Sequence, residues 1–419
     1  MGAIAVERAL LDGEEVGLRV GGDGLISELG PGVGGAPDDE AIDGRGLALL
    51  PGFVNGHTHA AMTLFRGFAD DLPLMEWLED HIWPAEARLD AEDVYWGTRL
   101  ACAEMIRGGT VRFWDMYWQP GATARAAADA GLRVVIGAPL IDGGDAAGTG
   151  KLREDAAAGL EEAAAVGSDL VASSLAPHAI YTVSDESLEW IAGEAERLRI
   201  PIQIHASETE GEVEGCVAAH GVRPIEHLDR LGLLGERTLL AHSVWIDERE
   251  REMILAAGAT VVTNPVANMK LAVGAAFDLP AAQRLGIPVG LGTDGAGSNN
   301  SLDVLADAKH LALLQKHAAA DASVASAEEV LAIATGARAP LLGAGRLEVG
   351  APADFILVRV DTPELGLGSL AAGLVYSASG AVVDTTVVGG RVLMRGGVVE
   401  GIEEILERAR ERARRIGLR

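Results

Sequence analysis

The chain has 419 residues, of which 34 are basic and 62 acidic, giving a formal net charge of -28 at pH 7. So acidic a chain repels phosphate backbones and anionic lipid headgroups, which argues against a nucleic-acid polymer or a membrane as partner. The two cysteines, Cys102 and Cys216, form no CxxC pair, which excludes a disulfide framework and a thiolate zinc site. With no targeting or transmembrane segment visible, we expect a cytoplasmic protein that acts on a small molecule; whether it forms a homo-oligomer stays open.

The first fifty residues hold short apolar pieces, such as Gly24–Leu29, that Gly-Pro and Gly-Gly pairs interrupt. Helical periodicity of useful length is missing there, so the pattern predicts small antiparallel strands. We expect these strands to pair with others from the far end of the chain.

From residue 51 to residue 345, buried strand-like runs alternate with helical stretches such as Asp185–Arg199 and Asp247–Ala257. This alternation predicts an α/β fold, namely a (β/α)8 TIM barrel. The eight expected strands are Gly52–Asn55, Thr110–Trp114, Arg133–Ile136, Leu170–Ser174, Pro201–Ile204, Thr238–Leu240, Thr260–Thr263 and Ile287–Leu291.

After residue 345 strand-like pieces return, at Asp354–Val358, Val382–Val388 and Arg391–Met394. We expect residues 1–50 and 346–400 to form one composite β-sandwich domain beside the barrel. Residues 401–419 place apolar side chains at helical spacing, with Glu at the start and Arg at the end. That pattern predicts a C-terminal helix docked on the surface.

Histidines and an acidic residue stand where several of the expected strands end, which in a barrel is the active-site face. His57 and His59 alternate at the end of the first strand, so their imidazoles point the same way. His205 ends the fifth strand, His242 the sixth and Asp294 the eighth. Three imidazoles and a carboxylate suit zinc and leave room for a water, whose pKa the metal would lower towards ~7. The sequence therefore predicts a metal site.

Other patterns point less clearly to chemistry. Gly290–Gly295 matches GxGxxG but contains Asp294 and opens no second nucleotide-binding unit. The chain has no Walker A, HExxH or GxSxG sequence. The remaining histidines lie in helical or loop stretches and are interpreted as ordinary structural or surface residues: His81, His220, His227, His310 and His317.

Several segments resemble the amidohydrolase superfamily, and within it the 5'-methylthioadenosine/S-adenosylhomocysteine deaminases. They are Pro51–His59, Ala85–Glu86, His205–Glu210, Ala241–Ser243, Asn264–Pro265 and Gly292–Ser301. The resemblance implies that His57, His59, His205 and Asp294 bind one divalent metal per chain. Zinc is favoured, with iron and manganese as alternatives. Binuclear relatives carry a carboxylated Lys at the end of strand 4, where this chain has none.

The resemblance further implies hydrolytic deamination of adenosine-type nucleosides such as adenosine and methylthioadenosine. Glu208 would deliver a proton to the ring nitrogen beside the attacked carbon. Asp294 would take the proton of the attacking water and pass it to the departing ammonia, and His242 would orient or polarise that water.

The resemblance to these deaminases implies that Glu86 would hold the ribose hydroxyls and that Trp77, His178 and Ser298 would line the nucleoside pocket. The loop at residues 138–144 lacks the arginine expected for a homocysteine carboxylate, so Lys151 or Arg153 would have to replace it. Recognition of S-adenosylhomocysteine therefore stays open. Two alternatives also remain: a deaminase or hydrolase of guanine, an oxidised purine, a pterin or an s-triazine, and a noncatalytic scaffold.

Overall fold

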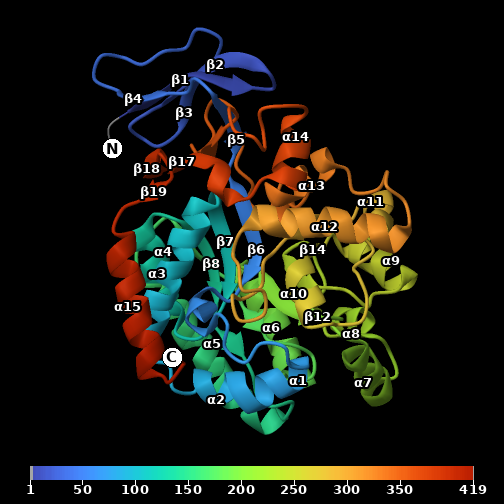
Figure 1. Cartoon of the computed structure of the whole chain (residues 1–419). Coiled ribbons are helices and arrows are strands. Elements are labelled where there is room, and N and C mark those ends of the chain that lie inside the picture. The colour runs from blue at the N-terminus through green and yellow to red at the C-terminus, as the bar shows by residue number, and fades with distance from the viewer. Residues whose placement is uncertain (1–2, 419) are drawn as a thin grey trace.

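A computed structural model describes residues 3–418 of the chain; residues 1, 2 and 419, which belong to the expected sandwich and C-terminal helix, lie outside the described residues. Strands from both chain ends lie in one nine-stranded sheet, with the blue strands at the top of Figure 1 and the red ones beneath them. Their order is β19-β18-β17-β16-β5-β1-β2-β3, and β4 also pairs with β1. The strands are β1 (Ile4–Leu11), β2 (Glu14–Val20), β3 (Ile26–Gly30), β4 (Glu40–Asp43), β5 (Leu47–Pro51), β16 (Phe355–Arg359), β17 (Val383–Val388), β18 (Arg391–Arg395) and β19 (Val398–Val399).

This terminal sheet differs from the expectation in one respect. β1, β2 and β3 are antiparallel, but β4 and β5 run parallel to β1. The chain leaves β1 through β2 and β3 and then returns to the other side of β1 in the original direction, which gives parallel pairing. The two ends share a buried cluster that includes Leu18, Leu49 and Phe355. Hydrogen bonding runs through a single sheet, and the two layers of a sandwich remain a prediction.

The middle of the chain forms parallel sheets. One has the order β10-β8-β7-β6, a second the order β12-β13-β14-β15, and β11 pairs with β9. Backbone hydrogen bonds link the two larger sheets on both sides: Leu175 N to Pro201 O at 2.9 Å, and Asp294 N to His57 O at 3.0 Å. The strands are β6 (Phe53–Thr58), β7 (Thr110–Met116), β8 (Arg133–Gly137), β9 (Pro139–Leu140), β10 (Val171–Ser173), β11 (Ala176–Pro177), β12 (Ile202–Ala206), β13 (Thr238–His242), β14 (Thr260–Thr263) and β15 (Val289–Leu291).

Each of the eight expected strands overlaps a strand of the structure. The fourth is interrupted, because the chain forms β10 and then the separate two-residue strand β11. Pro177 of β11 and Pro139 of β9 have no N–H to donate, so this part of the ladder cannot be long.

Helices cover the outer side of the parallel strands (Figure 1). α6 and α9 begin after the side-chain caps Ser184 and Asp247, and each lies within one residue of its expected bounds. The helices are α1 (Leu74–Glu76), α2 (Trp83–Glu86), α3 (Ala91–Arg107), α4 (Pro120–Ala130), α5 (Thr149–Ala164), α6 (Asp185–Leu198), α7 (Glu210–His220), α8 (Pro224–Arg230), α9 (Glu248–Ala257), α10 (Pro265–Lys270), α11 (Leu279–Leu285), α12 (Val304–Ala319), α13 (Ala327–Ala334), α14 (Leu370–Ala372) and α15 (Ile402–Arg415). Short 3-10 or π segments are η1 (Ala60–Phe65), η2 (Trp77–Ile82), η3 (Ala146–Gly148), η4 (Pro340–Leu342), η5 (Gly373–Ser377) and η6 (Gly380–Val382).

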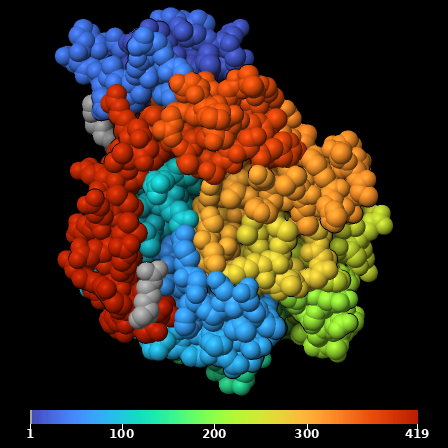
Figure 2. Space-filling view, in the orientation of Figure 1, coloured from blue at the N-terminus to red at the C-terminus, as the bar shows by residue number. Residues whose placement is uncertain are grey.

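The C-terminal helix α15 lies on the surface, as the red segment in Figure 2 shows. It packs against α3, burying Ile405 and Ala409, and the Arg415 guanidinium donates to the buried Asp93 carboxylate at 3.0 Å. Among the helices of residues 3–418, none combines the length and apolar character needed to cross a bilayer.

Candidate active site

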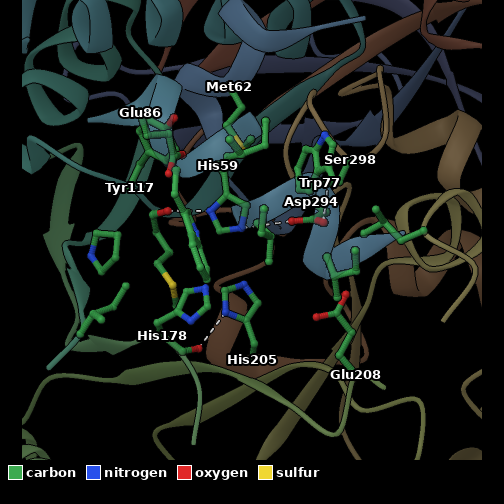
Figure 3. Close-up of a pocket in the computed structure, with 18 of the residues that line it drawn as sticks. His59, Met62, Trp77, Glu86, Tyr117, His178, His205, Glu208, Asp294 and Ser298 are labelled. Carbon is green, nitrogen blue, oxygen red and sulfur yellow. Dashed lines mark hydrogen bonds and ion pairs between the residues drawn. The ribbon is translucent and has the colours of Figure 1, made fainter. Parts of the chain in front are cut away.

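Side chains from the ends of two strands and from one loop lie close together; Figure 3 labels three of them, His59, His205 and Asp294. His57 lies in β6, His59 directly follows that strand, His205 lies in β12, and Asp294 follows β15. The ring centroids of His57 and His59, and of His57 and His205, are 4.9 Å apart. Asp294 Oδ1 lies 3.2 Å from His59 Nε2 and 3.5 Å from His57 Nε2. We call His57, His59, His205 and Asp294 the strand-end cluster.

The strand-end cluster has the donors that a divalent cation needs. Within residues 3–418, both ring nitrogens of His57 and Oδ1 of Asp294 are buried without a hydrogen-bond partner. The outer nitrogens of the other rings are held by backbone carbonyls: His59 Nδ1 lies 2.6 Å from Met116 O, and His205 Nδ1 lies 2.8 Å from His178 O. Such contacts fix the tautomer and leave Nε2 free for a metal. Imidazole and carboxylate donors together suit zinc.

Burial and the Asp294 charge set the protonation of this cluster. Burial lowers the pKa of His57 to about 4 and that of His205 well below its usual value. Burial also acts on His59, but the contact with Asp294 outweighs it and raises that pKa to about 9. Likewise, Asp294 is buried, yet its contacts with His57 and His59 hold its pKa well below the usual range. A bound cation would compete with a proton on His59 for the charge of Asp294.

Two further titratable groups adjoin the strand-end cluster. His242, at the end of β13, lies with its ring centroid 5.7 Å from that of His57. Its Nδ1 is 2.7 Å from Asn268 Oδ1 and 3.8 Å from Glu208 Oε1. Burial raises the pKa of Glu208, so its carboxyl group keeps a proton to higher pH than a solvated Glu does. This pair can therefore hold and move protons beside the cluster.

A cleft of about 720 Å³ opens above these groups. Its lining contains all four residues expected to contact the substrate: Trp77, Glu86, His178 and Ser298. Figure 3 shows Glu86 and Tyr117 on one side of His59 and Glu208 well away from them. The Trp118 indole N–H donates to Glu86 Oε2 at 3.3 Å, and burial raises the pKa of Glu86.

Ser298 has a second contact that its expected role does not include. Its hydroxyl donates to Asp294 Oδ2 at 2.6 Å, and so it orients the carboxylate whose Oδ1 faces His57 and His59. His178 Nδ1 lies 3.0 Å from the Thr182 hydroxyl, which holds its ring against the cleft.

Sequence reasoning missed several supporting residues. Glu212 accepts the backbone N–H groups of Ser207 and Glu208 at 2.7 and 2.8 Å and so shapes the turn that carries Glu208. Asn268, which holds His242, lies inside a helix with no motif of its own. Asp115 accepts the Ala60 N–H at 2.6 Å, and burial raises its pKa to about 7. Of these three residues, only Asp115 could have been found from the sequence, because it directly follows the expected strand Thr110–Trp114 and therefore lies at the active-site end of the expected barrel.

Comparison with known proteins agrees with this geometry. The sequence profile of the amidohydrolase family matches residues 48–393. The chain belongs to the amidohydrolase family. The 5'-deoxyadenosine deaminase of Methanoregula boonei is 43% identical over 407 residues, covering 96% of this amidohydrolase and 92% of its own length. The 5-methylthioadenosine/S-adenosylhomocysteine deaminase 1 of Archaeoglobus fulgidus is 43% identical over 408 residues, with 96% and 95% covered.

Among solved structures, an adenosine deaminase from Xanthomonas campestris with bound zinc superposes with a TM-score of 0.89 at 34% identity. The match covers 100% of this amidohydrolase and 98% of that chain. The similarity therefore extends over the terminal sheet as well as the parallel strands, and the expected family is confirmed.

Proposed function

We propose that this amidohydrolase deaminates adenosine-type nucleosides by hydrolysis, releasing ammonia and leaving the inosine analogue. The observation that carries the proposal is the placement of Glu208 and Glu86 in one cleft, with the strand-end cluster at its base. A proton-transfer group and a carboxylate suited to a diol thus face the same space. The deaminases named above, at 43% identity over most of their length, support the same reaction class.

The strand-end cluster would hold one divalent metal, with zinc favoured and iron or manganese as alternatives. When bound, the metal would lower the pKa of a water and so make a nucleophile available at neutral pH. Bound zinc in the Xanthomonas relative supports this choice. In this chain the end of β11 offers His178 and no lysine, which supports a single metal.

The remaining steps belong to the chain's own side chains. Glu208, whose pKa burial raises, delivers a proton to the ring nitrogen next to the reacting carbon as the ring loses its aromaticity. Asp294 takes the proton that the attacking water loses and passes it to the leaving amino group, which departs as ammonia. The proton of the added hydroxyl then returns to Glu208 as the ring carbonyl forms. His242, fixed by Asn268, orients the water.

Glu86 favours a substrate that carries ribose. Within the described residues no ion pair involves its carboxylate, and the Trp118 indole N–H donates to it at 3.3 Å. A vicinal diol supplies two hydroxyl donors in the geometry that a carboxylate accepts. A free base would leave this partly buried charge without those donors. Trp77 and His178, which also line the cleft, would contact the nucleoside.

The cleft also favours small, apolar 5' groups. Its lining includes Leu74, Leu78 and Ile141 but neither Lys151 nor Arg153. Lys151 forms an ion pair with Asp155 at 2.6 Å, and the Arg153 guanidinium lies 5.4 Å from the Trp190 ring centroid. Both cations are thus engaged elsewhere. We infer that 5'-deoxyadenosine and methylthioadenosine are better substrates than S-adenosylhomocysteine.

We also propose how the parallel sheets and the two chain ends are organised into domains. The hydrogen bonds at both sides of the parallel sheets support a closed (β/α)8 barrel over residues 51–345. Residues 1–50 and 346–400 would form the composite β-sandwich, and residues 401–419 the C-terminal helix. The free, buried thiols of Cys102 and Cys216 are in keeping with a cytoplasmic location.

A substrate panel tests the proposal. Ammonia release is measured with adenosine, 5'-deoxyadenosine, methylthioadenosine, S-adenosylhomocysteine, guanine and an s-triazine. We expect the highest kcat/KM with 5'-deoxyadenosine or methylthioadenosine. Activity confined to guanine or the triazine would overturn the nucleoside assignment, and a metal-loaded protein inactive on every compound would favour the scaffold alternative.

A further inference from the structure

A second group of metal-binding side chains lies on the outer helices, apart from the strand-end cluster. Asp185 is the first residue of α6, His220 the last residue of α7, and His227 lies within α8. Each offers one nitrogen or oxygen atom, and these atoms all lie within 4.8 Å of one another. We call these three residues the helical cluster. The turn between α7 and α8 is only residues 221–223, which holds the two histidines close together.

Both imidazoles face the same carboxylate. His227 Nε2 lies 2.9 Å from Asp185 Oδ1, and His220 Nδ1 lies 3.6 Å from Asp185 Oδ2. The two rings are stacked, with centroids 3.9 Å apart and planes 29° from parallel. A structural hydrogen bond needs only His227 and Asp185. That hydrogen bond does not explain why the His220 ring also faces Asp185, with its Nδ1 3.6 Å from Oδ2, which is too far for a hydrogen bond.

Charge and exposure fit a cation at this point. The Asp185 carboxylate supplies a negative charge that faces a nitrogen of each imidazole. The side chains of His220 and Asp185 are 31% and 48% exposed, so water can reach the carboxylate and complete a coordination sphere. His227 itself is buried, which fixes one side of the cluster.

We propose that Asp185, His220 and His227 form a second divalent-metal site, for a cation of the zinc, cobalt or nickel class. The ligand atoms would be His220 Nδ1, His227 Nε2 and an Asp185 oxygen, with water in the remaining positions. Two imidazoles and one carboxylate favour these metals over Mg²⁺ or Ca²⁺, which prefer all-oxygen sites. On binding, the proton that His227 Nε2 shares with Asp185 would move to Nδ1 of the same ring, so the imidazole stays neutral.

This site is separate from the reacting groups. His220 lines a groove of about 1940 Å³ that reaches Glu208 at another part of its wall, but it is not part of the cleft above the strand-end cluster. Metal binding at the helical cluster therefore does not depend on which nucleoside the cleft accepts. If the proposed function is wrong, the proposal of a second metal site still stands.

Zinc counting tests the proposal. Full-length protein is dialysed against buffers of increasing free zinc, and bound zinc per chain is measured by elemental analysis. At the lowest free-zinc concentration that fills both wild-type sites, we expect the wild type to bind nearly one equivalent more than His220→Ala or Asp185→Asn, because each change removes a ligand or its charge. Loss of a ligand weakens a site by about tenfold or more. His317→Ala, an exposed histidine on α12, is the matched control and should bind as the wild type does.

Thermal unfolding of each variant checks that it is folded, so that zinc binding is compared between folded proteins. Asp185→Asn is the milder change, because the side chain keeps its size. Deaminase activity is expected to be unchanged in all three variants. Equal zinc binding by the wild type, His220→Ala and Asp185→Asn would overturn the proposal, as would an extra equivalent that disappears only in His317→Ala.

Discussion

The two sides of the active-site cleft are built from different parts of the fold. The strand-end cluster lies on β6, β12 and the loop after β15, where backbone carbonyls hold the rings of His59 and His205. The substrate side, which we call the recognition wall, consists of Trp77 and Glu86 on the short segments η2 and α2. These segments belong to the connection that follows β6. If the proposed function holds, groups at the ends of the parallel strands carry the chemistry, while side chains of one connection contact the substrate.

Metal removal should have the largest effect and should act through the strand-end cluster alone. Chelation is expected to abolish ammonia release, and one equivalent of zinc per chain at this cluster should restore it. The reason is that, within residues 3–418, both ring nitrogens of His57 and Oδ1 of Asp294 are buried without a hydrogen-bond partner, so they are available to a metal. Elemental analysis alongside the assay checks this. A reproducible need for two equivalents in a His220→Ala background, where the helical cluster is disabled, would contradict a mononuclear centre.

Glu208→Gln should lower kcat by about 10²-fold or more. The amide keeps the shape of the buried side chain but cannot carry the proton, while the strand-end cluster is left intact. Zinc content should therefore equal that of the wild type. Turnover near the wild-type rate would remove Glu208 from the mechanism, and loss of zinc would assign it to the metal site instead.

Glu86→Ala should separate the recognition wall from the chemistry. With methylthioadenosine we expect kcat/KM to fall by about 100-fold or more, since two hydrogen bonds to a charged group are lost and each contributes roughly 1.5–3 kcal/mol. Most of the change should appear in KM. Any slow turnover of free adenine serves as the control and should stay the same. An equal loss with nucleoside and base would show that Glu86 does not hold the ribose.

The variant Ser298→Ala tests whether Ser298 acts through the strand-end cluster or through substrate binding. Its hydroxyl donates to Asp294 at 2.6 Å, so we expect kcat to fall by about tenfold while KM changes little. Ser298→Thr retains the hydroxyl and is the conservative control. A rise in KM with kcat unchanged would place Ser298 on the recognition wall, where the sequence resemblance put it.

Lys151→Ala and Arg153→Ala should have the smallest effect. Neither residue lines the cleft, so the ratio of kcat/KM for methylthioadenosine to that for S-adenosylhomocysteine should stay within about twofold of the wild-type ratio, a negligible free-energy change. A strong wild-type preference for S-adenosylhomocysteine that either variant abolishes would show that this part of the chain binds the amino-acid tail.

The sequence reveals groups that sit on regular strands and hides those that depend on distant contacts. His57 and His59 are visible because alternate residues of a strand share a face. Asn268 and Glu212 are not, since each is defined by a partner on another segment or by a turn. The parallel pairing of β4 and β5 was missed for a similar reason, because it depends on the path the chain takes around β1.

The most direct test of the account is the fate of the oxygen and nitrogen atoms. Zinc-loaded protein is incubated with methylthioadenosine in H₂¹⁸O, and the product is examined by mass spectrometry while ammonia is measured. The account predicts one ¹⁸O atom on the ring of an intact inosine-type nucleoside and one ammonia per product molecule. Release of the free base, or turnover without ammonia, would contradict it.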